Sequence, residues 1–424
     1  MTTLYDELSW RGLVYDATEG VQEALAKEHV TAYIGFDPTA SSLHVGNLLV
    51  LMALARLQRF GHSPIAIAGG GTGLIGDPSG KSQERSLLSN EQLEQNLAGI
   101  KVQLARFLDF EISTNPARLV NNADWLGACD LLGFLRDTGK YFTVNYLLQK
   151  ESVNRRLESE DGISFTEFSY LLLQARDFLE LFDRFGCTLQ MGGSDQWGNI
   201  TAGIDLIRKL RAKKAHGLVM PLVTTASGVK FGKTEAGAVW LDAGRTPPFA
   251  FYQFWLNTDD RDVLAYLRFF TFLARDAIVA LEHAHVEAPE KREAARVLAR
   301  EVTTLVHGAE EAVKAEHGAA ALFAGDLGSM AAAELLRVLG DVPSTTVSAN
   351  ELAQHALPKW LATVGLASSS SEATRLIRGG GIYVNSLRAT DEKKRLSRDD
   401  AIDGEIIVLG KGQRQKHVLR VKGE

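Results

Sequence analysis

The stretch GFDPTASSLHVGN, residues Gly35–Asn47, joins a short apolar run at Val30–Gly35 to a helical pattern at Asn47–Phe60. Gly61 follows that pattern in the position of a helix C-cap, and a second apolar run occupies Pro64–Gly69. Strand, helix and strand in this order form a βαβ unit, which gives a parallel sheet with its binding site at the carboxyl ends of the strands. The sequence therefore predicts an α/β fold with a Rossmann-like parallel sheet.

The α/β pattern continues to about residue 240, so we expect a first domain over residues 1–240. Gly162–Phe185 is helical, and Leu218–Val223 has the composition of another buried strand. From Pro248 to His317 the chain has few glycines and is rich in Ala, Leu, Glu and Arg. This composition is typical of helices, and it predicts a helical domain over residues 241–340.

The end of the chain differs from the rest in charge. Pro343 and a Ser/Thr cluster at Asp341–Ser348 predict a linker, followed by a small α+β domain over residues 350–424. From Ser371 onward there are twelve Lys and Arg against eight Asp and Glu, whereas the whole chain has a formal net charge of −6. A basic tail on an acidic body is typical of an appended nucleic-acid-binding module, although small basic domains have many uses.

Two glycine motifs in the segment after the second strand are incomplete. The spacing from Gly71 to Gly76 fits the dinucleotide fingerprint GxGxxG, but Asp77 would repel a phosphate there, and no acidic residue follows a strand about 20 residues later. Gly80–Ser82 imitates the end of a P-loop, but that motif requires glycine where the chain has Ile75. Neither a nicotinamide or flavin site nor a P-loop is expected, and a glycine turn without ligand remains an alternative.

Two other segments have the chemistry of a polyphosphate site. His44 lies at the start of a helix, where the helix dipole and free backbone N–H groups favour phosphate, and Gly46 would let a base approach the backbone. The segment KFGKT at Lys230–Thr234 places two lysines three residues apart, which suits a loop that closes over phosphates. The alternatives are an exposed or helix-capping histidine and a solvated basic turn.

Two further segments have the chemistry of a polar pocket. In GGSDQWGN, Gly192–Asn199, the side chain of Asp195 could accept hydrogen bonds from ribose hydroxyls and Gln196 could bind a carboxylate, although a structural turn is the alternative. One helix face carries polar residues at positions i, i+4 and i+7, namely Tyr170, Gln174 and Asp177. Such a face is either a solvated stripe or the wall of a pocket, and periodicity does not separate the two.

These segments together resemble a known family. HVGN at His44–Asn47 resembles the HIGH signature of class I aminoacyl-tRNA synthetases, and KFGKT resembles their KMSKS loop. With GDPSG at Gly76–Gly80 and GGSDQWGN, the joint occurrence in this order resembles the bacterial tyrosyl-tRNA synthetases. The similarity runs from WRGL at Trp10–Leu13 to the basic tail.

The resemblance implies site residues. Tyrosine would be bound at its phenolic hydroxyl by Tyr33 and Asp177, at its α-ammonium group by Asp77, Tyr170 and Gln174, and at its carboxylate by Gln196. ATP would be bound by Gly35, Asp37, His44, Gly46, Asn47, Gly193, Asp195 and Lys233. Catalysis would involve Thr39 and His44 at the phosphates and Lys81, Arg85, Lys230, Lys233 and Thr234 at the departing pyrophosphate. The implied enzyme is a tyrosine–tRNA ligase that forms tyrosyl-adenylate and charges tRNA.

The resemblance also implies the partners of the enzyme and the roles of its other domains. Residues 241–340 would help recognise the anticodon region of tRNA(Tyr), and the tail would contact RNA phosphates through Arg375, Arg378, Lys393, Lys394 and Arg395. The substrates would be L-tyrosine and ATP with Mg²⁺ accompanying the nucleotide, with no tightly bound cofactor and no dedicated metal site. The enzyme would be a homodimer. The two cysteines form no CxxC pair, and no apolar run reaches the roughly 20 residues of a membrane span, so we expect a cytoplasmic protein without a membrane partner.

The sequence departs from the family pattern at two positions. Asn47 replaces the second histidine of HIGH, and Ile34 stands where relatives often have cysteine. Three alternative functions remain open. A tryptophan synthetase is disfavoured by Tyr33 and Asp177, and an RNA-binding or splicing factor without catalysis is disfavoured by the intact lysines of KFGKT. A nucleotidyltransferase with a similar HxGH turn would not need so long a chain.

Overall fold

The computed structural model describes residues 2–79, 88–159, 162–228, 231–234, 237–324, 327, 331–339, 342–412 and 415–422. The chain divides into two compact units. The first consists of Met1–Asp242 and Thr258–Leu298, and the second of Ala243–Asn257 and Ala299–Glu424. The three-domain division expected from the sequence stays a prediction.

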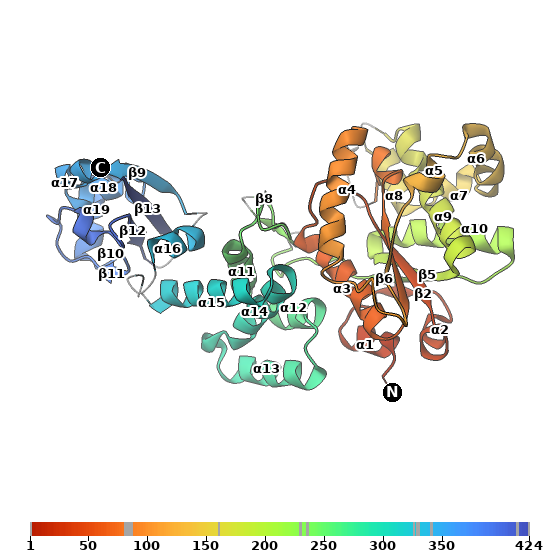
Figure 1. Ribbon diagram of the computed structural model, residues 1–424, viewed down its shortest axis with the longest axis horizontal. Coiled ribbons are helices and arrows are strands. Elements are labelled where there is room, and N and C mark those ends of the chain that lie inside the picture. Colours follow the sequence, from red (N-terminus) through yellow and green to blue (C-terminus); the bar gives the residue numbers. More distant parts are fainter. Residues whose placement is uncertain are drawn as a thin grey trace. The chain divides into compact units, whose positions relative to one another are not determined.

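The first unit is built on a mainly parallel sheet (Figure 1). Its strands lie in the order β1 (Asp16–Ala17), β6 (His216–Met220), β5 (Cys187–Gly193), β2 (Thr31–Phe36), β3 (Ser63–Ala68) and β4 (Arg118–Asn121). Strands β2 to β6 pair in parallel, and only β1 is antiparallel to its neighbour β6. The predicted α/β fold with a parallel sheet is therefore confirmed. Because β3 and β5 lie on opposite sides of β2, the strand order reverses there, which is where such sheets bind ligands.

The βαβ unit predicted from the sequence forms with small shifts of its ends. Helix α3 (Val45–Arg59) lies between β2 and β3 and begins two residues earlier than expected, because His44 is its N-cap residue. The interior of α3 is buried, so its pattern is apolar nearly all round. Helix α9 (Phe165–Phe185) ends at Gly186, whose φ of 61° suits glycine, and it packs beside α10 (Trp197–Arg211) (Figure 1).

Shorter elements complete the first unit. Its other helices are α1 (Leu4–Trp10), α2 (Val21–Lys27), α4 (Asn90–Leu104), α5 (Ala123–Leu126), α6 (Leu131–Asp137), α7 (Val144–Leu148), α8 (Glu151–Leu157), α12 (Val263–Phe270) and α13 (Arg275–Glu287). Directly after β3, the described residues 69–79 form a 3₁₀ turn at Thr72–Leu74 and not the helix that a dinucleotide fingerprint requires. The strands β7 (Lys233–Thr234) and β8 (Gly237–Ala238) form a short hairpin. Helix α14 (Glu293–His307) continues into the second unit.

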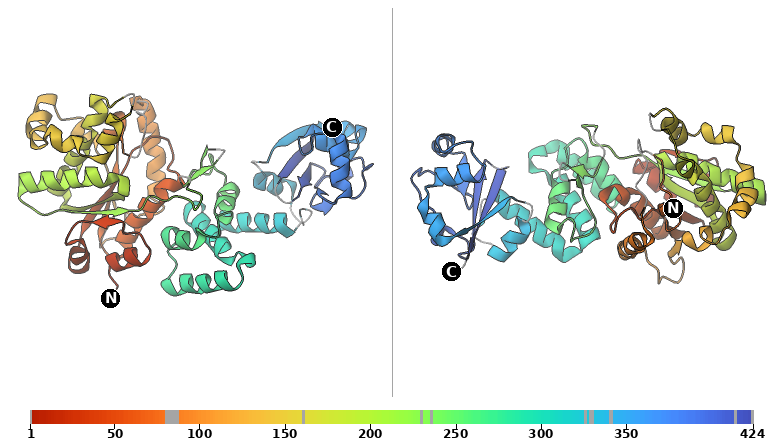
Figure 2. Two further views of the ribbon diagram at one scale, coloured as in Figure 1. Left: turned by 180° about the vertical axis from the view of Figure 1, so that it is seen from behind. Right: turned by 90° about the horizontal axis from the view of Figure 1, so that it is seen from above.

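The second unit contains helices and a mixed sheet, whose strands are drawn in blue (Figure 2). The helices are α11 (Pro248–Leu256), α15 (Ala309–Ala324), α16 (Ala332–Val338), α17 (Ala349–Gln354), α18 (Leu357–Thr363) and α19 (Ser370–Arg378). The strand order is β11 (Leu387–Arg388), β10 (Ile382–Val384), β12 (Ile406–Lys411), β13 (Gln415–Lys422) and β9 (Ser344–Ser348). The core of this part of the unit includes Trp360 and Leu361.

The prediction of a linker at Asp341–Ser348 is wrong for residues Ser344–Ser348. These residues form β9, which pairs in parallel with β13 from Val418 to Lys422. The run STTVS contains β-branched residues and buries Val347, so it fits the edge of a sheet despite its polar composition. In the described part of the chain, no helix is long and apolar enough to cross a membrane.

Candidate active site

A cavity of about 350 Å³ opens at the carboxyl ends of β2 and β5, within the volume range of small-molecule sites. The sheet register explains its shape. Tyr33 pairs with Ile65 on one side and Gln190 on the other, and the buried side chains of Tyr33 and Gln190 line one end of the cavity, which we call its closed end. Two residues further along β2, Gly35 pairs with Ile67 and lines the cavity without a side chain. The glycine therefore leaves room above the sheet for a ligand.

The closed end of the cavity carries a hydroxyl and a carboxylate. Tyr33 and Asp177 are 1% and 3% exposed and both line the cavity. Among the described residues the Tyr33 hydroxyl has no hydrogen-bond partner. Burial raises the pKa of Tyr33 well above its ordinary value, so its hydroxyl stays protonated. A neutral donor beside a carboxylate can bind a ligand hydroxyl that both accepts and donates a hydrogen bond.

Two residues that the sequence did not single out hold this carboxylate. The Nδ2 of Asn122 donates to Asp177 Oδ2 at 2.9 Å, and the Nε1 of Trp125 donates to Oδ1 at 2.7 Å. Burial raises the pKa of Asp177 to about 7, while these two hydrogen bonds act in the opposite direction. Asn122 directly follows β4, and its place at a strand's carboxyl end was the signal that could have revealed it.

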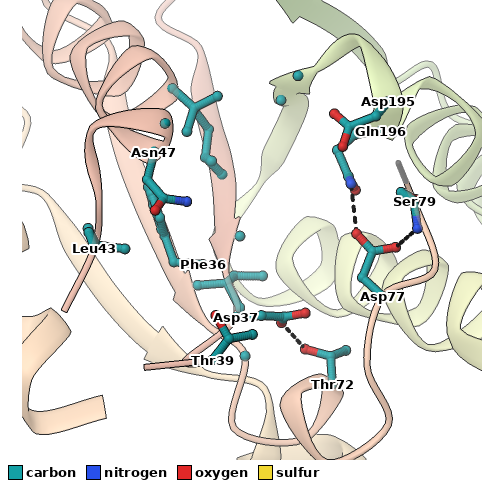
Figure 3. Close-up of a pocket in the computed structure, with 18 of the residues that line it drawn as sticks. Phe36, Asp37, Thr39, Leu43, Asn47, Thr72, Asp77, Ser79, Asp195 and Gln196 are labelled. Carbon is teal, nitrogen blue, oxygen red and sulfur yellow. Dashed lines mark hydrogen bonds between the residues drawn. The ribbon is translucent and has the colours of Figure 1, made fainter. Parts of the chain in front are cut away.

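A polar network fixes the next part of the cavity (Figure 3). Gln196 Nε2 donates to Asp77 Oδ2 at 2.8 Å, and the backbone N–H of Ser79 donates to Asp77 Oδ1 at 2.9 Å. Gln174 Nε2 donates to Gln196 Oε1 at 3.2 Å, and Asn199 Nδ2 donates to Gln174 Oε1 at 2.9 Å. Since Asp77 is buried, this network presents an oriented carboxylate and amide groups, a suitable environment for an ammonium group.

A second carboxylate lies beside this network. Asp37 accepts hydrogen bonds from the hydroxyl of Tyr170 at 2.9 Å and from that of Thr72 at 2.8 Å. Burial, and then the neighbouring charge of Asp37, raise the pKa of Tyr170 well above its ordinary value. The three polar residues of the α9 face, Tyr170, Gln174 and Asp177, all line the cavity, so this face is a pocket wall and not a solvated stripe.

The open end of the cavity contains the start of α3. Asn47 Oδ1 accepts a hydrogen bond from the backbone N–H of His44 at 3.1 Å, so this departure from the HIGH pattern caps the helix. A Cβ atom at Gly46 would lie 2.8 Å from Cε1 of His44, so only glycine lets the imidazole lie there. Asp195 lies across the cavity from Asn47 (Figure 3).

The structure brings most predicted site residues to this one cavity. Its lining includes Tyr33, Ile34, Gly35, Asp37, Thr39, His44, Gly46, Asn47, Asp77, Tyr170, Gln174, Asp177, Gly193, Asp195 and Gln196. Lys81, Arg85 and Lys230 lie outside the described residues. The backbone of Lys233 and Thr234 forms β7. Among described residues, no group of three or more His, Cys, Asp and Glu side chains is arranged to hold a metal ion.

The predicted RNA contacts lie in the second unit. Arg375 and Lys393 are exposed. Arg378 pairs with Glu392 at 2.7 Å, and Lys394 pairs with Asp400 at 2.7 Å. The exposed Arg395 donates from Nη1 to the carbonyl oxygen of Ala353 at 2.8 Å. Three of the predicted cations therefore already have partners within the chain.

Comparison with known proteins defines the class. The family profile "tRNA synthetases class I (W and Y)" matches residues 25–324, and the profile of the "Tyrosine--tRNA ligase SYY-like C-terminal domain" matches residues 334–419. A truncated mitochondrial tyrosyl-tRNA synthetase from Aspergillus nidulans superposes with a TM-score of 0.70 at 32% identity, over 76% of this chain and 95% of that one. A tryptophanyl-tRNA synthetase from Encephalitozoon cuniculi, at 12% identity and a TM-score of 0.51, shares the fold over 73% of this chain and 87% of its own. The first unit therefore has the class I synthetase fold.

Full-length relatives narrow the class to a family. A tyrosine–tRNA ligase from Roseiflexus castenholzii is 56% identical over 99% of this chain and all of that protein. Another, from Geobacillus stearothermophilus, is 51% identical over 98% of this chain and 99% of its own length. The chain therefore belongs to the tyrosine–tRNA ligases of class I.

Proposed function

We propose that the cavity activates L-tyrosine with ATP, and that the enzyme then transfers the tyrosyl group to the 3′-terminal ribose of tRNA(Tyr). The observation that carries this proposal is the buried pair at the closed end. The hydroxyl of Tyr33 would donate to the phenolic oxygen of the substrate, and the phenolic O–H would donate to Asp177. Phenylalanine would leave the Tyr33 hydroxyl buried without a partner and would offer Asp177 no further donor, which is costly, and an indole N–H cannot accept from Tyr33.

The remaining polar groups fit the rest of an amino acid. Asp77, Tyr170 and Gln174 would hold the α-ammonium group, since Asp77 is a buried carboxylate oriented by Gln196 and Ser79. Gln196 would then donate to the substrate carboxylate. In this arrangement the side chain of tyrosine points to the closed end, and its carboxylate faces the open end of the cavity.

The first reaction needs no protein nucleophile. A carboxylate oxygen of tyrosine attacks the α-phosphorus of ATP and forms the acyl–phosphate bond, while the bond from this phosphorus to pyrophosphate breaks. Catalysis then depends on position and on charge stabilisation. Thr39 and His44, beside the start of α3, would contact the phosphates, and Lys81, Arg85, Lys230, Lys233 and Thr234 would hold the departing pyrophosphate.

The nucleotide would occupy the open end of the cavity. Gly35, Asp37, Gly46, Asn47, Gly193 and Asp195 line it and would surround the adenosine, with Asp195 accepting from the ribose hydroxyls. Within the described part of the chain, no group of three or more His, Cys, Asp and Glu side chains is arranged to bind a metal ion. Mg²⁺ would therefore enter as part of the MgATP substrate, held mainly by the phosphates.

In the second reaction a hydroxyl of the terminal ribose of the tRNA attacks the activated carbonyl, and AMP leaves. Residues 241–340 would contact the anticodon region. Arg375, Arg378, Lys393, Lys394 and Arg395 would contact RNA phosphates. Among the described residues, the exposed Arg375 and Lys393 form no ion pair, whereas Arg378 and Lys394 do.

We also propose that the enzyme is a homodimer. Large apolar side chains are exposed along one part of the first unit, on α6, α7, α8 and the start of α9, namely Leu131, Leu132, Leu135, Val144, Leu148, Leu157 and Phe165. Such a concentration of exposed apolar groups is typical of an interface. Cys129 and Cys187 are free thiols, which favours a reducing compartment such as the cytoplasm.

The function is tested by amino-acid-dependent ATP–pyrophosphate exchange with tyrosine, phenylalanine and tryptophan. The proposal predicts exchange with tyrosine and a far lower rate with the other two. Exchange driven by tryptophan would preserve adenylate chemistry but contradict the roles of Tyr33 and Asp177. Absence of exchange with all three, in folded protein that binds tRNA, would favour a non-catalytic RNA-binding protein.

A further inference from the structure

The phenylalanine inside the KFGKT segment is buried in an aromatic cluster. Phe231 is 5% exposed, and its ring stacks on that of Phe270, with centroids 5.2 Å apart and an interplanar angle of 18°. Its ring also meets the edge of Tyr266 at 4.9 Å. Phe270 and Tyr266 themselves pack edge to face at 5.6 Å on α12. We call these three residues the aromatic seat. A merely solvated basic turn would not bury a ring in this way.

The helix that carries the seat is fixed to α3. The side chain of Arg56, 2% exposed and close to the end of α3, donates from Nη2 to the carbonyl oxygens of Phe269 at 2.9 Å and Thr271 at 2.7 Å. Arg11 donates from Nη1 to the carbonyl oxygen of Arg268 at 2.8 Å. These carbonyl groups lie at the C-terminal end of α12, where the last carbonyl oxygens of a helix have no partner within the helix. Two arginines therefore hold α12, one of them on the same helix whose first turn contains His44.

The other side of the segment packs against the start of α3. Gly232, next to Phe231, has a φ of 80°, and a Cβ atom there would lie 2.6 Å from Cγ2 of Val45. The carbonyl oxygen of Gly232 accepts from Val239 N at 3.1 Å, and the carbonyl oxygen of Val239 accepts from Val45 N at 2.9 Å. The backbone at Gly232 is therefore fixed against the turn that carries His44 and Gly46.

We infer that Phe231 is a positioning residue. The packing of its ring in the aromatic seat fixes the position of the KFGKT segment relative to the first turn of α3. This inference rests on the proposed assignment of Lys230 and Lys233 to the phosphates. Both lysines are within two residues of Phe231 in the sequence, so we expect a shift of the Phe231 backbone to displace them. Misplacement of such groups by about 1 Å costs up to about 100-fold in rate. Phe231 lines the cavity, but we assign it no contact with the reacting atoms and infer that it acts through the lysines.

The test compares single-turnover formation of tyrosyl-adenylate in Phe231→Ala, Phe270→Ala and the double variant. Phe270 does not line the cavity, so it affects the loop only through the seat. We expect each single variant to lower the rate about 10-fold, the double variant to be no slower than the slower single one, and the dissociation constant of tyrosine without ATP to change less than about 2-fold. Phe231→Met, whose thioether can fill an aromatic site, should restore most of the rate.

Three results would overturn the inference. They are a rate within about 2-fold of wild type for Phe231→Ala, fully additive effects of the two substitutions, and a loss of tyrosine binding that parallels the loss of rate. Thermal melting of each variant separates a positioning effect from unfolding, and Phe231→Met keeps the test valid if an alanine variant does not fold. Lys233→Ala distinguishes failure of this inference from failure of the proposed function. If Lys233→Ala lowers the rate and Phe231→Ala does not, the positioning role of Phe231 is wrong and the proposed phosphate contact stands. If Lys233→Ala has no effect, the proposed phosphate contact of Lys233 is wrong as well.

Discussion

The two units of the chain differ in how their predicted functional residues are arranged. In the first unit, residues from β2, α3, α9 and the turn after β5 meet in one cavity, where Asp77, Asp177 and Gln196 are oriented by neighbours. In the second unit, the predicted cations lie on different elements, and Arg378 and Lys394 pair with acidic residues of the same chain. Motifs that combine glycine, polar and charged residues predicted side chains that share one cavity, whereas a count of charges predicted only a region of the chain.

The largest effect should follow loss of the carboxylate at the closed end. Asp177→Ala removes the acceptor for the phenolic hydroxyl, and hydrogen bonds to charged groups contribute about 1.5–3 kcal/mol. We expect kcat/KM for tyrosine in ATP–pyrophosphate exchange to fall about 100-fold. An unchanged value in the folded variant would remove the main support for the proposed binding mode. Arg375→Ala, in the second unit, is the matched control and should exchange at the wild-type rate.

The next effect is a pH dependence of tyrosine binding. Burial raises the pKa of Asp177 to about 7, so the carboxylate is mostly ionised at pH 8 and mostly protonated at pH 6. Only the ionised form accepts the phenolic hydrogen bond fully, so the dissociation constant of tyrosine should rise about 10-fold as the pH falls from 8 to 6. The measurement omits ATP, so that the proposed nucleotide end of the cavity does not contribute to the pH dependence. A flat profile for wild type, or an unchanged slope in Asp177→Asn, would contradict this origin.

A smaller effect should come from Trp125, which only orients Asp177. The indole N–H of Trp125 lowers the pKa of the Asp177 carboxyl. Trp125→Phe should therefore raise the pKa of Asp177 and move the midpoint of the pH profile of tyrosine binding to higher pH. Loss of one such hydrogen bond corresponds to about 2- to 10-fold weaker binding at pH 7. Isothermal titration at several pH values checks it. A uniform loss of affinity at every pH would indicate a packing defect instead.

The smallest effects belong to single cations of the second unit. Arg375→Ala and Lys393→Ala should each raise the KM for tRNA a few-fold and reduce its salt dependence, because each removes one phosphate contact. Arg378→Ala should change it less, since that guanidinium is paired with Glu392. Aminoacylation measured at several salt concentrations distinguishes these variants. Equal effects for all three would show that pairing within the chain does not predict which cations bind RNA.

The sequence predicted the architecture around its strongest patterns. The βαβ unit at Thr31–Ala68 was placed within about one or two residues, because apolar runs bounded by glycine and proline are clear signals. It missed β9, since STTVS is polar and short, and it missed β5, since glycines end that strand. Both strands are stabilised by pairing partners far along the chain, and these partners cannot be identified from the local sequence.

The same distinction holds for the site. Residues within signatures, such as His44 and Asp195, were found because their neighbours in sequence are informative. Trp125 was missed, because its role depends on Asp177, more than 50 residues away, and only the fold brings the two together. Asn122 was missed because β4, the strand that it follows, was not predicted. The pocket side of α9 likewise could not be separated from a solvated face before its burial was known.

The most direct test of the central claim measures the ratio of kcat/KM for tyrosine to that for phenylalanine in wild type and in Tyr33→Phe. If Tyr33 and Asp177 together read the phenolic hydroxyl, loss of the Tyr33 hydroxyl should lower this ratio about 10-fold, by slowing tyrosine and sparing phenylalanine. If the ratio is unchanged while both substrates slow equally, Tyr33 does not contact the hydroxyl and the account of the closed end is wrong.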